Sequence, residues 1–178
     1  ELLKSVKAEG LLERRVGFYV TLFASLVLLM AATWLGFALI GDSWFQLLIA
    51  AAVGVLCTQL SFLAHEAGHR QIFASRRAND WPARILATSV AGMSYPWWGQ
   101  KHGAHHNHPH VISKDPHIAT WATAFPPAGA VTRQGRFTSP TRKQSWFFFT
   151  LLFLDGLGRH IATVKFVSRV VRATSPRA

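Results

Sequence analysis

Two long uncharged runs stand out in the pattern of apolar and polar positions along the chain. The first covers residues 16–41, the second covers residues 43–64, and only Asp42 separates them. A helix needs about 20 apolar residues to cross a hydrocarbon core of roughly 30 Å. Each run therefore predicts a transmembrane helix, and the short break at Gly41-Asp42 predicts that the two helices form a tight hairpin.

The rest of the chain is less uniformly apolar. Residues 1–15 predict a short amphipathic or irregular lead-in, and residues 65–143 predict a cytoplasmic and interfacial region rich in Trp, which prefers the headgroup level of a bilayer. A third apolar run covers 144–165, but Asp155 interrupts it, so it predicts either a span with functional polar groups or a helix in the membrane plane. We therefore expect an all-α integral membrane protein that forms a single domain over 1–178.

Charge refines this prediction. Half of the residues are hydrophobic, 15% are charged, and 19 Lys and Arg against 8 Asp and Glu give a formal net charge of +11. The arginines flank the apolar runs: Arg14 and Arg15 before the first, and Arg70, Arg76, Arg77 and Arg84 after the second. Such flanks are typical of cytoplasmic loops, so both outer ends of the hairpin are expected in the cytoplasm. This distribution argues against nucleic-acid binding, and the single cysteine excludes a disulfide framework.

Five of the nine histidines fall into two clusters. His65 and His69 are four residues apart, directly after the second apolar run, and the second cluster consists of His102, His105 and His106. Residues three or four apart share one face of a helix at a separation of about 5–6 Å. Imidazole suits Fe, Zn, Cu and Ni. The spacing therefore predicts metal binding at the cytoplasmic surface of the membrane.

One alternative is an intramembrane zinc metallopeptidase. His65-Glu66-Ala67-Gly68-His69 fits the H-E-x-x-H motif, in which the glutamate is a general base, and Leu154-Asp155-Gly156 could supply a third zinc ligand. A single zinc ion with three protein ligands would leave the second histidine cluster without a role. So many nitrogens fit two metal ions better than one.

The second cluster also carries a family resemblance. The segment 97–106, Trp-Trp-Gly-Gln-Lys-His-Gly-Ala-His-His, followed by Pro109 and Asp115-Pro116, resembles the second histidine box of membrane fatty acid desaturases. Residues 65–69 resemble the first box, H-x-x-x-H, and residues 11–15 and 152–160 match the general run of the family. The chain departs from the family at Gly103, where Asn is usual.

This resemblance implies an oxygen-dependent reaction that introduces a double bond into a fatty acyl lipid or acyl-CoA. It implies two non-haem iron ions as cofactor, O2 as co-substrate and an electron donor such as a ferredoxin or a cytochrome b5 type protein. Related hydroxylases, ketolases and epoxidases share the boxes, so they remain open as alternatives.

The resemblance also implies the roles of particular residues. The expected iron ligands are His65, His69, His102, His105, His106 and His160. Glu66, Asp115 and Asp155 are expected to orient imidazoles by hydrogen bonding, as carboxylates commonly do for metal-bound histidines. His108, His110 and His117 are expected to be loop residues without a ligand role.

A third box of the type H/Q-x-x-H-H is typical of the family but is absent from this sequence. We therefore expect the chain to be a portion cut at both ends, or a truncated desaturase that sits in the membrane without doing chemistry.

Overall fold

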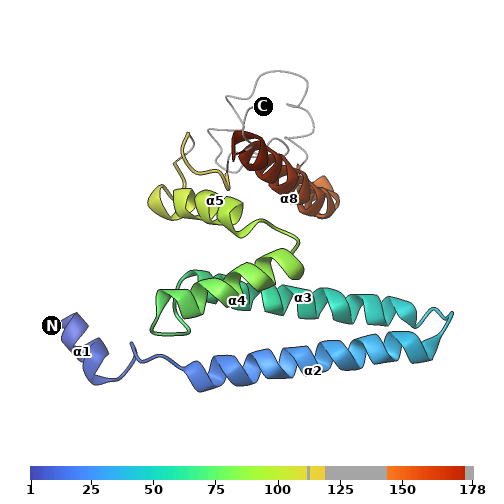
Figure 1. Cartoon of the computed structure of the whole chain (residues 1–178), viewed down its shortest axis with the longest axis horizontal. Helices are drawn as coiled ribbons and strands as arrows, with labels where there is room; N and C mark the ends of the chain where they lie inside the picture. The colour runs from blue at the N-terminus through green and yellow to red at the C-terminus, as the bar shows by residue number, and fades with distance from the viewer. Residues whose placement is uncertain (112, 119–143, 175–178) are drawn as a thin grey trace. The chain divides into compact units, whose positions relative to one another are not determined.

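The computed structural model describes residues 1–111, 113–118 and 144–174 (Figure 1). Over these ranges the chain is helical and contains no strand, which confirms the predicted all-α class. The chain divides into two compact units, Glu1–Gly92 and Met93–Ala178.

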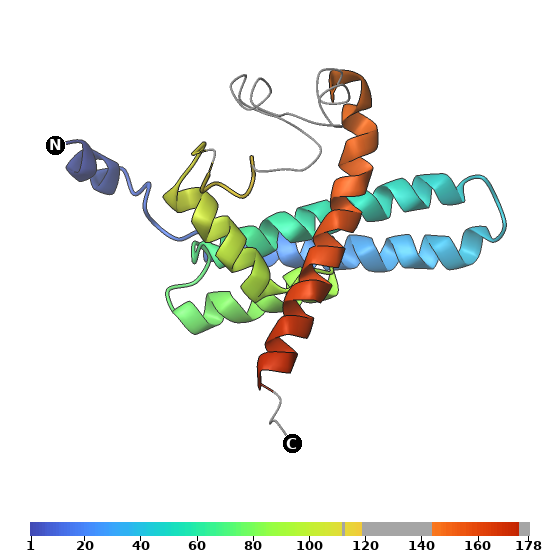
Figure 2. The ribbon, with the colours of Figure 1, turned by 90° about the horizontal axis from the view of Figure 1, so that it is seen from above.

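The first unit contains the predicted membrane hairpin. After a short helix, α1 (Leu2–Ala8), come α2 (Val16–Ile40) and α3 (Gln46–Gly68), which lie side by side and antiparallel in Figures 1 and 2. Both helices are long and apolar enough to cross a membrane, as expected from the two uncharged runs. Helix α3 begins three residues later than predicted and continues four residues further, so the chain is still helical at the first histidine.

The turn between α2 and α3 depends on a glycine and an amide side chain. Gly41 has a φ of +65°, a left-handed conformation that only glycine adopts without strain. Gln46 Nε2 donates to the carbonyl oxygens of Phe37 at 3.0 Å and of Gly41 at 2.8 Å. These carbonyls would otherwise lack partners at the end of α2, because the last turn of a helix has no following amides.

Helix α3 packs against α2 on one side and against α4 (Arg76–Ser89) on the other. Its buried residues recur at helical spacing and are Leu56, Leu60, Leu63, Ala64 and Ala67. On α4, Ala83 is fully buried, like Ala67 of α3. Small side chains of this kind let two helix backbones approach closely. The core therefore lies along the half of α3 that leads to His65.

A single buried asparagine organises the chain between α3 and α4. Asn79 Oδ1 accepts from the amides of Ile72 at 3.2 Å and Phe73 at 3.0 Å. Its Nδ2 donates to the carbonyl oxygens of Phe73 at 2.6 Å and Ser75 at 2.7 Å. The side chain is fully buried, so these bonds replace water for a stretch of irregular backbone.

The second unit contains α5 (Tyr95–Asn107) and α8 (Gln144–Thr174). Ser94 caps α5 by accepting from the Trp97 amide at 3.5 Å, and its own amide donates to Thr163 Oγ1 of α8 at 3.4 Å. The predicted third apolar helix is confirmed and extends nine residues beyond its expected end at residue 165. Residues 112 and 119–143 of the predicted cytoplasmic and interfacial region lie outside the described residues.

Helix α8 is not straight. It bends by 47° between Ser145–Leu152 and Leu154–Thr174, and the two parts together are long and apolar enough for one membrane span. Gly156 and Gly158 lie within about one and a half helical turns after the bend. Glycines are a common cause of such kinks. Asp155, in the first turn after the bend, forms an ion pair with Arg159 that partly offsets the cost of both charges in an apolar helix.

The role of Asn79 gives a stability prediction. Asn79→Leu should lower the free energy of unfolding in detergent by about 2 kcal/mol or more, because the amides of Ile72 and Phe73 and the carbonyls of Phe73 and Ser75 lose their partner. Thermal unfolding followed by circular dichroism measures the change. Asp80→Asn is the matched control, since it removes only an i,i+4 surface pair with Arg76 and should cost about 0.5 kcal/mol at most. Equal melting temperatures for the two variants would contradict the structural role of Asn79.

Candidate metal centre

The first histidine cluster lies where α3 ends. His65 is in the last turn of the helix, and the His69 amide donates to the His65 carbonyl at 3.0 Å, so the two residues keep helical spacing. Their ring centroids are 4.5 Å apart with an edge-to-face arrangement. The predicted adjacency of the two imidazoles is therefore present in the structure.

Glu66 lies beside this cluster and connects it to α2. Its Oε1 is 3.7 Å from His65 Nδ1, which is an electrostatic contact and too long for a hydrogen bond. Its Oε2 accepts from the hydroxyl of Tyr19 on α2 at 3.3 Å. The carboxylate is therefore held near the imidazole that it was predicted to orient.

The second cluster lies along one side of α5. His102 and His106, four residues apart, have ring centroids 4.5 Å apart and Nε2 atoms 3.0 Å apart. The His105 ring is 6.3 Å from that of His102 and 5.7 Å from that of His106. Two nitrogens that both lie about 2.1 Å from one metal ion, at right angles, are about 3.0 Å apart, so the His102 and His106 nitrogens have the separation of neighbouring ligands.

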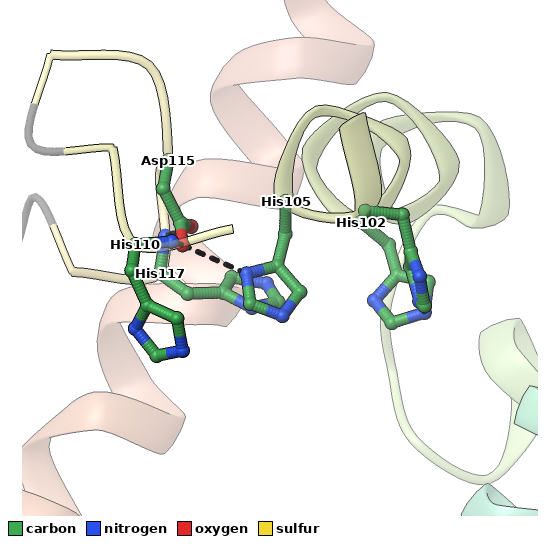
Figure 3. Close-up of polar contacts among 6 residues, drawn as sticks. His102, His105, His110, Asp115 and His117 are labelled. Carbon is green, nitrogen blue, oxygen red and sulfur yellow. Dashed lines mark hydrogen bonds and ion pairs between the residues drawn. The ribbon is translucent and has the colours of Figure 1, made fainter. Parts of the chain in front are cut away.

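A buried carboxylate fixes the orientation of His105. Asp115 Oδ2 lies 2.9 Å from His105 Nδ1 and accepts from the His110 amide at 2.9 Å, while Oδ1 accepts from the His117 amide at 2.8 Å (Figure 3). Asp115 is fully buried. The loop that follows α5 therefore wraps around one carboxylate, which ties it to the helix through His105.

The charge state of Asp115 determines the tautomer of His105. Burial alone raises the pKa of Asp115, but the amides of His110 and His117 and the contact with His105 outweigh burial and hold that pKa at about 2. At neutral pH the carboxylate is ionised and can only accept hydrogen bonds. His105 Nδ1 must then carry the proton, which leaves the lone pair on Nε2, the nitrogen that can bind a metal.

His117 was not predicted as a site residue, yet the structure brings it into the second cluster. Its ring stacks on that of His105 at 4.4 Å and 28°, and lies 6.0 Å from that of His102. Burial, His105 and Lys101 lower the pKa of His117, which favours the neutral form that binds metals. Ligand atoms of His105, Asp115 and His117 lie within 4.8 Å of one another and could hold an ion.

The signal that could have revealed His117 is its position two residues after Asp115. An aspartate often bonds the amide two residues further on, which folds the chain back on itself. His108 and His110 are exposed, in agreement with their prediction as loop residues. His110 has a φ of +64° and contributes its backbone amide to the site.

The polar residues of α8 have a different environment. Asp155 Oδ2 accepts from Arg159 Nε at 2.6 Å, so this carboxylate is engaged by a guanidinium of its own helix. Lys101 of α5 lies 5.5 Å over the ring of Trp97, and burial, followed by the nearby charge of Arg159, lowers the pKa of its ammonium. His160, an expected iron ligand, is exposed on α8. The ligand role of His160 and the orienting role of Asp155 stay predictions.

Aromatic rings support the second cluster from the start of α5. Trp98 stacks on His102, with centroids 4.6 Å apart and planes 18° apart, and Tyr95 stacks on Trp98 at 5.7 Å. Flat stacking restricts rotation of the His102 ring. Trp98 therefore positions His102 from one side, as Asp115 positions His105 from the other end of the cluster.

The described residues form a helical protein with two apolar candidate spans and two histidine clusters that could bind metal. Comparison with known proteins gives the family. A family model described as "Fatty acid desaturase" matches residues 42–174. The chain is 30% identical over 119 residues to Fatty acid desaturase 2-like protein FADS2B of Mus musculus, covering 66% of this chain and 24% of that protein. It is 32% identical over 91 residues to the Delta(8)-fatty-acid desaturase of Helianthus annuus, covering 51% of this chain and 20% of that protein.

Fatty acid desaturase 3 of Homo sapiens is 27% identical over 138 residues, which cover 75% of this chain and 31% of that protein. No solved structure matches the chain significantly. The chain belongs to the fatty acid desaturase family, and it spans less than a third of the length of the curated relatives it matches. The family match includes both histidine clusters. It gives no support to the zinc-peptidase alternative.

The geometry around Asp115 gives a prediction for metal affinity. Asp115→Asn should weaken metal binding about 10- to 100-fold, because an amide no longer fixes the Nδ1–H tautomer of His105. The affinity can be measured by titrating the metal-free protein in detergent with Co²⁺ and following the visible absorption of the complex. Asp42→Asn, the same change in the hairpin turn, is the control and should leave the affinity unchanged. An Asp115→Asn affinity equal to that of the control would show that this carboxylate does not orient the ligand.

Proposed function

We propose that this chain is part of a membrane fatty acyl desaturase that introduces a double bond into an acyl chain at a non-haem centre of two iron ions. The observation that carries this proposal is the second histidine cluster, in which Asp115 fixes His105 within the region matched by the family. The curated relatives are desaturases by name, and their activity is extended to this chain only as part of the proposal.

The residues present suit iron. The proposed ligands are all imidazoles: His65 and His69 from the first cluster, His102, His105 and His106 from the second, and His160 from α8. Imidazole is a common ligand of iron, and the Nε2 atoms of His102 and His106 have the spacing of two ligands of one ion. Both clusters are proposed to supply ligands to the same centre.

The chemistry requires a redox metal. A C–H bond within an alkyl chain has no acidic proton, so acid–base side chains cannot break it under mild conditions. Bound iron would supply the oxygen chemistry. The protein would bind and orient the acyl chain and exclude competing reactions. In this chain, Asp115 orients His105, Glu66 lies 3.7 Å from His65, and Trp98 restricts the His102 ring.

The proposal includes the surroundings of the site. The two apolar helices make this an integral membrane protein, and the arginines that flank them favour a cytoplasmic position for both histidine clusters. Fatty acyl lipid or acyl-CoA is the proposed substrate, O2 the co-substrate, and a ferredoxin or cytochrome b5 type protein the electron donor. A third histidine box elsewhere in the whole protein would complete the ligand set.

Metal content and product formation test the function together. The whole protein, purified aerobically in detergent, should contain about two irons per chain by elemental analysis, and its expression should give new unsaturated species in gas chromatography of host fatty acids. One zinc per chain, or an unchanged fatty acid profile with the iron site filled, would contradict the proposal. A hydroxylated product would identify a related oxygenase.

A pair of variants separates the desaturase from the zinc peptidase. His105→Ala should reduce the iron content to well under half and abolish product, because it removes a ligand of the second cluster. Glu66→Gln should retain most of the iron, since it lies 3.7 Å from His65 and does not itself bind metal in this proposal. The opposite result, with His105→Ala tolerated and Glu66→Gln inactive, is the behaviour of a peptidase with a glutamate base.

A further inference from the structure

The loop after α5 brings a carboxylate and a second imidazole to His105, within the second unit. Metal-ligating atoms of His105, Asp115 and His117 all lie within 4.8 Å of one another. Asp115 is fully buried and the two imidazoles are half-buried, so neither ring is closed off from solvent. Two histidines and one carboxylate are a set of three ligands that binds zinc and leaves a fourth position for water.

The separation of His105 Nδ1 from Asp115 Oδ2 suits a shared metal ion as well as a shared proton. The two atoms are 2.9 Å apart. Zinc lies about 2.0–2.1 Å from a histidine nitrogen and about 2.0–2.2 Å from a carboxylate oxygen. Two such atoms on one ion are therefore about 2.9–3.4 Å apart, for angles between a right angle and a tetrahedral one. This pair already has the spacing of two ligands, and His117 supplies the third.

The fold holds these three residues together through Asp115. Its Oδ1 accepts from the His117 amide at 2.8 Å, and the His117 ring stacks on the His105 ring with centroids 4.4 Å apart (Figure 3). Its Oδ2 also accepts from the His110 amide at 2.9 Å. Backbone amides are uncharged, so a bound cation would compensate the buried negative charge more fully than they do. The loop therefore combines ligand spacing with a buried charge that favours a cation.

We propose that His105 Nδ1, Asp115 and His117 bind one Zn²⁺ ion, and that this ion competes with the proposed iron centre for His105. A neutral imidazole carries one ring proton. When zinc takes Nδ1, that proton moves to Nε2, which then has no lone pair for iron; no proton is released, and the carboxylate stays ionised. Zinc binding stands on the geometry of this loop, whereas the competition with iron rests on the proposed function.

Titration of the metal-free full chain with Zn²⁺ in detergent tests the site itself. Native mass spectrometry counts the zinc ions per chain while a chromophoric chelator competes for zinc. His117→Phe is the decisive variant, because phenylalanine keeps a flat ring against His105 but has no ligand nitrogen. At a zinc concentration that saturates the unchanged protein, this variant should bind about one zinc ion fewer per chain, since two ligands hold zinc less well than three.

His110→Asn is the matched control. It removes an exposed imidazole from the same loop, and asparagine tolerates the φ of +64° at this position. His110 bonds Asp115 through its backbone amide, which the substitution keeps, so the variant should bind as much zinc as the unchanged protein. If His117→Phe fails to fold, as judged by its melting temperature, His117→Ala takes its place with the same expected loss. Equal zinc counts in the His117 and His110 variants overturn the zinc site.

A zinc challenge of the iron-loaded whole protein tests the competition. Zinc uptake should lower the iron content by about one ion per chain, because one imidazole cannot serve both metals, and the iron content of His117→Phe should not respond to zinc. Zinc uptake that depends on His117 but leaves the iron content unchanged overturns the competition.

The outcomes also separate this inference from the proposed function. Zinc binding that depends on His117, in a chain that takes up no iron, supports the zinc site and rejects the desaturase. Zinc that the purified protein retains in His117→Phe belongs to other histidines and counts against the desaturase alone. An iron-loaded, active protein with equal zinc binding in all variants keeps the desaturase and rejects the zinc site.

Discussion

Backbone amides and carbonyls that leave a helix need new hydrogen-bond partners, and in this chain three polar side chains supply them at the turns. Gln46 bonds the carbonyls at the end of α2, Asn79 bonds residues 72–75, and Asp115 bonds the amides of the loop after α5. The cost of leaving such groups unpaired rises where water is scarce. These side chains therefore determine where helices can end, and two of the three turns follow a histidine cluster.

The two histidine clusters are supported in different ways. His65 and His69 depend on regular helix spacing at the end of α3, with Glu66 held nearby by Tyr19. The second cluster has support from three directions, because Trp98 stacks on His102, Asp115 bonds His105, and His117 stacks on His105. Fixed rings lose little freedom when a metal binds, so the second cluster is the better preorganised of the two.

Much of this architecture follows from local sequence pattern, and the parts that do not follow depend on contacts distant in sequence. Uncharged runs of sufficient length predicted α2 and α3, and spacing by three and four predicted which imidazoles share a face. The predicted span ended at residue 64 because the first polar histidine follows, whereas α3 continues to Gly68, in keeping with the helical spacing expected of His65 and His69. His117 was missed because its approach to His105 depends on a loop folded around Asp115, which no periodicity encodes. The ion pair of Asp155 with Arg159 follows from their i,i+4 spacing, and the orienting role of Asp155 stays a prediction.

The stacking of Trp98 on His102 has a spectroscopic consequence. An indole in flat contact with an imidazole, at a centroid separation of 4.6 Å, is within reach of any ion that the imidazole binds. Paramagnetic ions shorten the lifetime of an excited indole at such range, whereas a closed-shell ion such as Zn²⁺ does so far less. Trp98 is thus an intrinsic fluorescent probe beside the second cluster. Its emission lifetime would distinguish a paramagnetic ion from a closed-shell ion bound there.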